Sequence, residues 1–597
     1  MPEGENAMKK MRYVGREAAD TRFHDGALRP VAGARHIQVL RANRERPELA
    51  EGTGWTYNHA PMLCYWSGFF YLMYLSSPVH EHGGMARVLL TRSPDGYAWE
   101  KPRLLFEDIA VPSGVYRGRR AEELTPGART VAHHRMGFYA AENGVLLAMT
   151  HLGVTPDVHV MPNSGYGMGR VARRIFPDGT MGPVCVLRIN AQAGWKPEHF
   201  PYPVWQDAED RELREACARL LDDPLATGAW WEEERLDEAF FPLKGIRAPS
   251  FCPLEDGTVA AMGKDGLFAM SEDGGRTWTA PEKAAGIFTS GGKCWMQRTP
   301  PGGFVILYNP SPDGQHRWPL AAITSEDGRE FDHMLAAGTE VPPMRYGGLL
   351  KNHGLNYIRG IMPGNGAPPD GGIWAAYSMN KEDIWVMRLP AELTGVETEA
   401  VDDVFSTEAE SFPGKWHVYS PLWASVRVES GCLVLRDGDP CDYAKAVRAF
   451  PRAERCEVTV QVSSDGAQRG ALHMELEDEK GMPAVRVILD GDGRIRVRAG
   501  NGEHLLGQRA AGEVVEIRME ADCAAQSVHI FLDGQAREEY PLMCPVLCVE
   551  RLILRTGETR RAPSPEDNLR GQCSPDIPGG WARLPEAVFR VRAVRVH

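Results

Sequence analysis

Ser271-Glu-Asp-Gly-Gly-Arg-Thr-Trp278 is the stretch that decides the fold, because Ser93-Pro-Asp-Gly-Tyr-Ala-Trp99 and Ser325-Glu-Asp-Gly-Arg-Glu-Phe331 repeat its pattern. Each stretch follows a short apolar run, begins with Ser, carries Asp two residues later and ends on an aromatic ring. The carboxylate can accept hydrogen bonds from turn amides and Gly supplies a positive φ, which is typical of a tight turn between strands. The second and third copies start about 54 residues apart, the length of one four-stranded blade. The repeat therefore predicts a β-propeller.

Short apolar runs bounded by Gly, Pro, Asp or Asn, such as GFVILYN and IWVMRLP, continue through residues 35–395. They predict strands joined by hairpin turns. At about 54 residues a blade, this region holds six or seven blades. Asp207–Asp223 interrupts the pattern, because Leu213, Cys217 and Leu220 stand at helical spacing. It predicts a helical insertion between blades.

From about residue 400 the apolar and charged residues alternate, as in RCEVTVQVS. Alternation is typical of antiparallel strands with one buried face. Eight or nine such strands predict a β-sandwich of jelly-roll or laminin-G kind. The fold class is therefore all-β, a six- or seven-bladed β-propeller followed by a C-terminal β-sandwich. We place an N-terminal extension at residues 1–34, the propeller at 35–395, a linker at 396–412 and the sandwich at 413–597.

The overall charge argues against a nucleic-acid partner, because 67 Lys and Arg stand against 80 Asp and Glu in 597 residues, a formal net charge of −13. The N-terminal segment lacks the apolar run of a secretory signal, and no run reaches the length of a membrane span. The 12 cysteines are scattered without a CxxC pair. We expect a cytoplasmic protein without a membrane partner, a metal or a cofactor, and the sequence leaves its oligomeric state open.

Four residues are candidates for catalysis. His59, in WTYNHAP, and His80, in HEHGG, lie 21 residues apart, so a hairpin could bring both rings to the mouth of the central channel. An imidazole takes up or releases protons near neutral pH. Arg135 can clamp a carboxylate with two hydrogen bonds. Tyr139 can donate a proton if its pKa is lowered, although a packed strand aromatic is the other interpretation of this residue.

Cationic and aromatic residues recur in the loops of successive blades. Guanidinium groups hold carboxylates, amides hold hydroxyl groups and aromatic rings stack on sugars, so the recurrence predicts a site for an acidic sugar. The predicted substrate-binding residues are Arg170, Lys293, Trp295, Arg298, Arg317, Arg345, Tyr346 and Arg359. Polar loop residues also occur at Asn356–Gly360 and Asn380–Asp383, and the carboxylates of Glu382 and Asp383 are the next acid/base candidates after His59. The expected partner is an oligosaccharide substrate.

The three Ser-x-Asp turns are similar to the Asp boxes, or BNR repeats, of sialidase-like β-propellers. Asn58-His59-Ala-Pro61 and the strand pair after it resemble propeller hydrolases and lyases that act on rhamnosyl-glucuronate linkages, and propeller ulvan lyases. This resemblance implies a glycoside hydrolase or polysaccharide lyase that cleaves a glycosidic bond in a uronate-containing oligosaccharide. It also implies a site in which His, Tyr and Arg neutralise the uronate and move a proton, a pattern that His59, His80, Arg135 and Tyr139 fit.

Two alternative functions remain open. The first is an exo-sialidase, because Arg247-Ala-Pro249 resembles an Arg-Ile-Pro motif and Arg247, Arg298 and Arg345 could form an arginine triad. Against it, sialidases carry that motif before their first Asp box, and here it precedes the second. The other is a non-catalytic carbohydrate-binding propeller, because most glycosidases need two carboxylates and the sequence shows no clear pair. Release of reducing sugar or of an unsaturated uronate separates hydrolase, lyase and binder.

Overall fold

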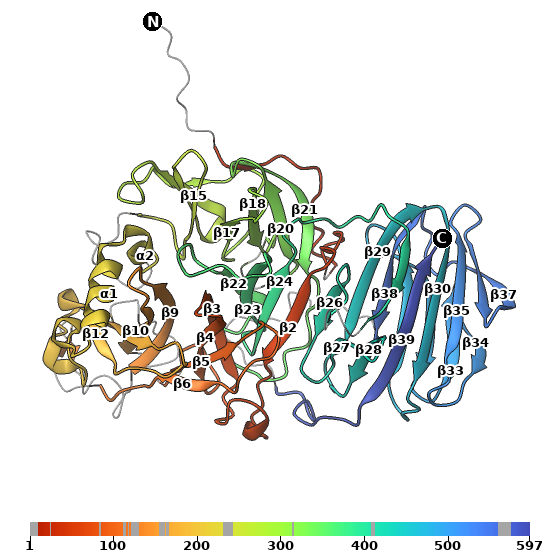
Figure 1. Cartoon of the computed structure of the whole chain (residues 1–597), viewed down its shortest axis with the longest axis horizontal. Helices are drawn as coiled ribbons and strands as arrows, with labels where there is room; N and C mark the ends of the chain where they lie inside the picture. The colour runs from red at the N-terminus through yellow and green to blue at the C-terminus, as the bar shows by residue number, and fades with distance from the viewer. Residues whose placement is uncertain are drawn as a thin grey trace, which may run out of the picture.

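The structure, a computed structural model, is dominated by β-sheets, with the propeller strands at one end and the sandwich strands at the other (Figure 1). It describes residues 10–23, 25–82, 85–111, 115–116, 119–120, 130–154, 162, 166–230, 243–312, 314, 316–406, 412–558 and 575–597, and of residues 115–116, 119–120 and 131–135 it describes the backbone alone. No helix in this described part is long and apolar enough to cross a membrane.

Four separate sheets of four or five strands form propeller blades. The first blade contains β3 (Tyr57–Trp66), β4 (Phe69–Ser77), β5 (Arg87–Ser93) and β6 (Arg103–Phe106). The second contains β9 (Thr130–Ala140), β10 (Leu146–Val154), β11 (Gly167–Ile175) and β12 (Cys185–Ile189). The third contains β13 (Ser250–Pro253), β14 (Val259–Met262), β15 (Leu267–Ser271) and β16 (Glu282–Lys283). The fourth contains β17 (Trp295–Arg298), β18 (Phe304–Tyr308), β20 (Leu320–Ser325) and β21 (Glu330–Gly338), which β1 (Arg12–Tyr13) joins.

A fifth set of four strands closes the ring and continues into the C-terminal domain. It contains β22 (His353–Gly360), β23 (Ile373–Met379), β24 (Asp383–Leu389) and β2 (Arg35–Leu40). The prediction of six or seven blades is therefore wrong: the described residues hold four separate blades and this fifth set. A division of the region by one repeat length fails because the described residues between β12 and β13, 190–230 and 243–249, form no blade.

The repeated Ser-x-Asp turns share one hydrogen-bond pattern. In the third blade, Asp273 Oδ1 accepts two hydrogen bonds, from Ser271 Oγ at 2.9 Å and from the amide of Thr277 at 2.8 Å. The turn ends when Trp278 Nε1 donates to the carbonyl of Gly275 at 3.0 Å, which packs the ring back on the turn. Ser93 and Ser325 make the corresponding bonds to their own Asp residues. These carboxylates accept hydrogen bonds from amides of their own turns.

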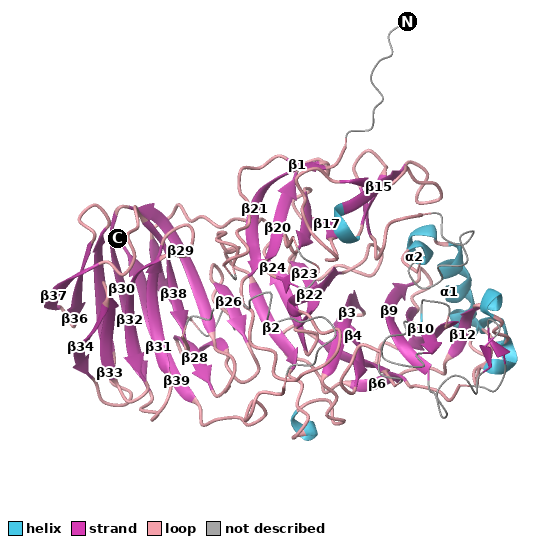
Figure 2. Cartoon of the chain, turned by 180° about the vertical axis from the view of Figure 1, so that it is seen from behind, coloured by secondary structure: helices cyan, strands magenta, loops and turns pink. Residues whose placement is uncertain are grey.

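The helical insertion consists of α1 (Arg211–Asp222) and α2 (Pro224–Gly228), beside the second blade (Figure 2). Asp210 caps α1 by accepting from the amide of Leu213 at 3.1 Å, and Asp223 caps α2. Buried Leu213, Cys217 and Leu220 pack with residues of β10 and β12. The insertion thus places α2 next to the propeller centre.

The C-terminal domain is a sandwich of two large sheets. One is part of the twelve-stranded sheet and contains β26 (His417–Ser420), β29 (Lys445–Ala453), β38 (Val549–Arg555), β31 (Ala471–Glu477), β32 (Pro483–Asp490), β33 (Arg494–Ala499) and β34 (Gly502–Gln508). The other contains β27 (Val426–Glu429), β28 (Cys432–Asp437), β39 (Ala587–Val596), β30 (Arg455–Ser464), β35 (Val515–Asp522), β36 (Ser527–Leu532) and β37 (Gln535–Pro541).

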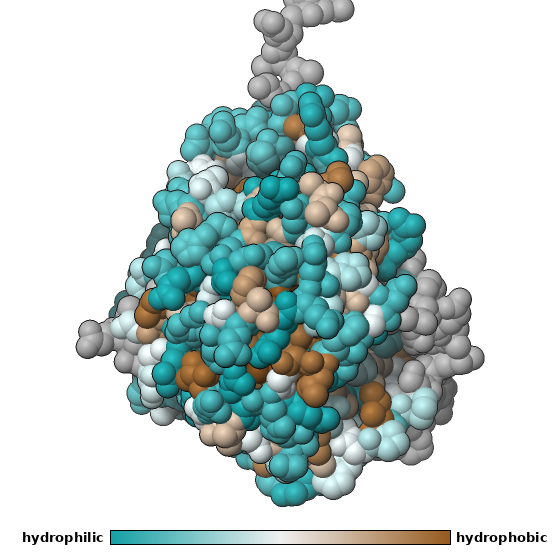
Figure 3. Space-filling view, turned by 90° about the vertical axis from the view of Figure 1, so that its right-hand side faces the viewer, coloured by the Kyte–Doolittle hydropathy of each residue, from teal (hydrophilic) through white to brown (hydrophobic). Residues whose placement is uncertain are grey.

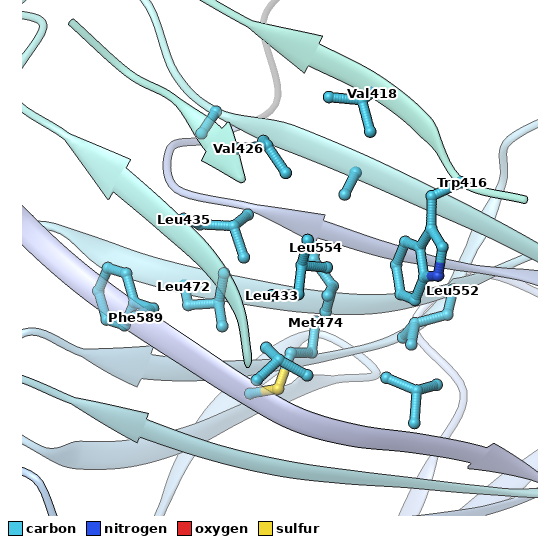
Figure 4. Packing of buried hydrophobic residues seen from close by; sticks show 14 of the residues in the cluster. Trp416, Val418, Val426, Leu433, Leu435, Leu472, Met474, Leu552, Leu554 and Phe589 are labelled. Atoms are coloured by element: carbon cyan, nitrogen blue, oxygen red, sulfur yellow. The ribbon is translucent and has the colours of Figure 1, made fainter. Parts of the chain in front are cut away.

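Apolar side chains from both sheets form the sandwich core (Figure 4). Leu433, Leu472, Met474 and Phe589 are each fully buried there. At the sandwich end of the molecule, the surface is mostly hydrophilic, with smaller apolar areas between the polar residues (Figure 3). The alternation in the sequence therefore separates a buried face from a solvated one.

The two domains share backbone pairing. β2 of the propeller pairs in parallel with β26 of the sandwich, so one sheet of twelve strands runs through both (Figure 1). The segment 396–412, expected to be a linker, contains β25 (Val401–Val404), which pairs with β39. Within the extension expected at 1–34, β1 adds to the fourth blade. Each of these two segments thus contributes one short strand to a sheet.

Candidate functional site

Two inner strands of the propeller carry bulges at the centre of the ring. β3 is irregular between His59 and Met62, where Ala60 has φ +51°, and β22 is irregular between Asn356 and Arg359, where Tyr357 has φ +55°. A positive φ is unfavourable for these residue types, and bulges re-aim side chains next to functional sites. The bulges turn His59 and Tyr357 toward each other, with ring centroids 4.3 Å apart.

Three lysines surround the Tyr357 ring. Lys264 Nζ donates to the Tyr357 hydroxyl at 3.1 Å. The Nζ atoms of Lys293 and Lys381 lie 3.9 Å and 5.9 Å from the ring centroid. Lys264 precedes β15, Lys293 precedes β17 and Lys381 precedes β24, so three different blade sheets supply them. We call His59, Tyr357, Lys264, Lys293 and Lys381 the axial cluster.

The axial cluster is buried and cationic. Lys293 and Lys381 are 2% and 4% exposed, while Lys264 is partly exposed and links the cluster to solvent. Lys381 Nζ donates to Glu81 Oε2 at 2.9 Å, so one carboxylate balances one of the three ammonium groups. Burial alone would raise the pKa of Glu81, but Lys381, His82 and His59 lower it on balance. Glu81 is therefore ionised and forms an ion pair with Lys381.

His59 is held in its neutral form. Its Nδ1 is 2.7 Å from Ser378 Oγ, and its side chain is fully buried. Burial lowers the pKa of His59 well below its ordinary value, and Lys381, Lys293 and Lys264 lower it further. The expectation that His59 titrates near pH 7 is therefore wrong. A neutral ring can still accept a proton during a reaction.

A cavity of about 260 Å³ adjoins the axial cluster. Lys293 lines this cavity and also contacts Tyr357, so it connects the cavity with the axial cluster. Trp295 and Arg359 form part of the wall, and Arg359 Nη2 donates to the carbonyl of Ala248 at 3.0 Å. The volume is close to the lower end of the range for small-ligand sites, about 300 Å³. Apolar residues contribute most of the remaining wall, among them Met62, Met136, Phe138, Leu225, Trp230, Phe251 and Met362.

The cavity also has two carboxylates, but both already have partners. Glu142 is an exposed residue that forms an ion pair with Arg219, and Asp223 caps α2. Tyr139 lines the same cavity, and burial, followed by Asp223 and Glu142, raises its pKa. The lowered pKa that proton donation by Tyr139 would require is therefore not found, because burial, Asp223 and Glu142 outweigh the opposite effect of Arg219.

Among the described side chains, His80 does not join His59. The ring of His80 accepts at Nδ1 from the amide of Leu349 at 2.9 Å, and burial, Lys351 and Arg44 lower its pKa. Glu81, the next residue, is the one that lies near His59. The side chain of Arg135 lies outside the described residues. The hairpin thus forms as expected, but it brings a carboxylate to His59 instead of a second imidazole.

The predicted substrate-binding residues divide into two groups. Lys293, Trp295 and Arg359 line the cavity. The remaining five do not line it. Arg170 is buried over the Trp230 ring, and Arg345 and Tyr346 lie in a buried network with Glu382. Arg298 and Arg317 donate to backbone carbonyls, those of Pro253, Ser290 and Gly291. The arginine triad of the sialidase alternative does not assemble, since Arg247 pairs with Asp265 and shares no contact with Arg298 or Arg345.

Sequence analysis gave no role to Lys264 or Glu81, and it placed Tyr357 and Lys381 only in polar loop stretches. Lys264 stands in the turn Gly263-Lys-Asp-Gly266 between two strands, which looks like an ordinary solvated turn. The signal that could have found the lysines is position: each stands two or three residues before a blade strand. Among the described residues, no group of His, Cys, Asp or Glu is arranged to hold a metal ion.

Comparisons with known proteins agree with this architecture. Residues 9–246 match a family described as BT_1020-like, N-terminal beta propeller, and residues 416–569 match a sialidase-like CBM domain. A solved structure titled "Sialidase" is 37% identical with a TM-score of 0.94, over 98% of this chain and 54% of that one, so this chain spans about half of its length. A Trypanosoma rangeli sialidase in complex with sialic acid is 11% identical over 95% of this chain and 96% of that one, with a TM-score of 0.34. No curated protein matches. The chain is therefore similar to a BT_1020-like β-propeller family over residues 9–246 and to a sialidase-like CBM domain over residues 416–569.

Proposed function

We propose that this protein cleaves a glycosidic bond in an acidic saccharide, and that the axial cluster is its reaction centre. The observation that carries the proposal is the convergence of three lysines from three blade sheets on Tyr357 and His59. Buried cations that converge beside a cavity are suited to bind an anion. The carboxylate of a sugar acid is an anion of suitable size for the adjoining cavity.

The lysines would act on charge that develops in the reaction. Cations fixed in a buried site stabilise a carboxylate, or the enolate that it becomes, more strongly than water does. Lys264 donates to the Tyr357 hydroxyl and so also stabilises negative charge on that oxygen. Tyr357 is then suited to be a base or a nucleophile, and neutral His59 to accept a proton.

Two reactions fit these groups. In β-elimination, a base removes the proton next to the neutralised carboxylate, the C–O bond to the leaving sugar breaks, and the leaving oxygen takes a proton. In hydrolysis, water replaces the leaving sugar and both products are saturated. Most glycosidases use two carboxylates, whereas here Glu81 is held by Lys381 and Asp265 by Arg247. The chemistry of the products decides between the two reactions.

A paired screen tests the proposal. Oligosaccharides that contain uronic or other sugar acids are incubated with the protein beside neutral oligosaccharides of equal length. Reducing-sugar release reports cleavage, and ultraviolet absorbance of an unsaturated uronate reports elimination. We expect cleavage of the acidic set alone. Cleavage of neutral sugars only would contradict the proposal, and binding without cleavage would favour the non-catalytic carbohydrate-binding alternative.

One variant pair locates the reaction centre. Tyr357→Phe removes only the hydroxyl and should lower kcat by about 10²–10⁴, the usual effect of losing a proton-transfer group. Tyr308→Phe is the matched control, because Tyr308 is also a buried tyrosine and lies in the fourth blade. A Tyr357→Phe variant with the kcat of the Tyr308→Phe control would show that the reaction occurs elsewhere.

A further inference from the structure

The C-terminal domain reaches the axial cluster through a loop of the propeller. Residues 345–351 precede β22 and form hydrogen bonds both with the sandwich and with the turn that contains Lys381. On the sandwich side, the amide of Gly347 donates to Asp576 Oδ1 at 2.9 Å, and the amide of Ile577 donates to the carbonyl of Arg345 at 2.8 Å. The loop therefore depends on a segment that follows β38 in the sandwich.

The same loop holds the turn that carries Lys381. Arg345 Nε pairs with Glu382 Oε1 at 2.9 Å, and the amide of Tyr346 donates to Glu382 Oε2 at 3.0 Å. Lys381 Nζ donates to the carbonyl of Leu350 at 2.6 Å as well as to Glu81. Both ends of this connection are buried, since Arg345 and Lys381 are each 4% exposed.

The turn itself needs support. Asn380 and Lys381 both have positive φ, at +56° and +54°, which costs free energy for residues other than Gly. Asn380 Nδ2 donates to the carbonyl of Pro342 at 2.9 Å, and Arg345 also pairs with Asp383. These contacts hold a strained turn in the one geometry that aims the Lys381 ammonium at the cluster.

A second connection reinforces the first. Arg41, directly after β2, makes two hydrogen bonds to Asp439 of the sandwich, at 2.8 Å and 2.9 Å, and its guanidinium lies 3.8 Å from the Trp423 ring centroid. Both charged side chains are almost fully buried, at 2% and 1% exposure. A buried pair of this kind fixes geometry, because breaking it would leave an unpaired charge.

We infer that the sandwich serves as part of the scaffold of the axial cluster, and that Asp576 is a positioning residue for the Lys381 ammonium. Its importance for catalysis rests on the proposed function, but its effect on Lys381 does not. Loss of the Asp576 carboxylate frees the amide of Gly347, loosens residues 345–351 and lets Lys381 leave Glu81. A sialidase-like carbohydrate-binding domain would then act here through the fold as well as through any sugar it binds.

Amine acylation followed by peptide mass spectrometry tests this inference on the full chain, with a water-soluble N-hydroxysuccinimide acetate ester as the probe. We expect Asp576→Ala to raise the acylation rate of Lys381 by about 10-fold, the scale of one lost charged hydrogen bond. Asp576→Asn retains an oxygen for the amide of Gly347 and should stay near wild type. This rescue separates the hydrogen bond from the ion pair that Asp576 forms with Arg44 at 2.6 Å.

Asp465→Ala is the matched control, because Asp465 and its partner Arg590 are 39% and 35% exposed, against 38% and 35% for Asp576 and Arg44. An unchanged Lys381 rate in Asp576→Ala, or an equal rise in Asp465→Ala, would overturn the inference. On a substrate from the screen, Asp576→Ala should lower kcat with a smaller change in KM. If the screen finds no substrate, the proposed function fails while the acylation result still decides this inference.

Discussion

Two buried histidines at the domain boundary make the fold sensitive to acid. His36 on β2 and His417 on β26 have ring centroids 5.3 Å apart, and both are at most 2% exposed. Burial lowers the pKa of His36 to about 4 and that of His417 to about 3. Lys445 lowers the pKa of His417 further, while Glu340 opposes both shifts. Both rings are therefore neutral in the folded chain near pH 7.

The sign of the pH effect follows from these two values. As the pH falls through 6.5, the unfolded chain takes up a proton on each histidine, whereas the folded chain does so only near pH 4 and pH 3. The contribution of the two neutral rings to the free energy of unfolding is thus fully present above pH 6.5 and is lost as the pH falls below it. A pH of 5 is about 1.5 units below the pKa of a histidine in the unfolded chain, so each of the two histidines lowers the free energy of unfolding by about 2 kcal/mol at that pH.

Urea unfolding of wild type and His417→Gln at pH 7.5 and pH 5 measures this cost. Gln can still donate to the carbonyl of Val31, which His417 Nδ1 contacts at 3.0 Å. The variant should be less stable at pH 7.5, and its deficit should shrink by about 2 kcal/mol at pH 5. Exposed His529→Gln is the control and should show no such convergence. A deficit that is equal at the two pH values would refute the reasoning.

Three further predictions concern single side chains. Lys264→Met should lower kcat by about 10²–10³ on an acidic substrate, because it removes one donor to the Tyr357 hydroxyl, and steady-state kinetics measure it. Burial raises the pKa of Asp437 to about 7. The free energy of unfolding of wild type should therefore fall by about 1.4 kcal/mol from pH 6 to pH 8, and that of Asp437→Asn should lack this fall; urea titrations at the two pH values measure it. Asp273→Ala should lower the melting temperature without changing kcat, because Asp273 accepts bonds only within its own turn.

Local pattern was sufficient to predict the elements of the fold. Alternation in the C-terminal part and the short apolar runs before it predicted strands because side-chain burial follows strand period. The spacing of Leu213 and Cys217 predicted a helix where α1 forms. Blade number could not be predicted in this way, because a long insertion and a closing strand from residues 35–40 break the count.

The candidate site could be predicted only in part. Lys293, Trp295 and Arg359 were found because cations and aromatic rings beside strand ends are typical of sugar sites. Tyr357 and Lys264 are 93 residues apart and meet only because the ring closes. The positive φ of Tyr357 depends on tertiary structure, since this residue type does not favour it. Long-range closure and strained backbone are the two features that a local pattern does not contain.

The charge of the whole chain and that of its centre have opposite signs. The formal net charge is −13, yet the axial cluster brings three lysines together around one ring. Surface charges act through water and salt, which screen them beyond about 8 Å, whereas buried charges are screened much less. An acidic saccharide would therefore meet weak repulsion at the surface and strong attraction at the centre. Affinity for an anionic ligand should then depend on the three lysines far more than on ionic strength, which distinguishes a built site from a basic surface.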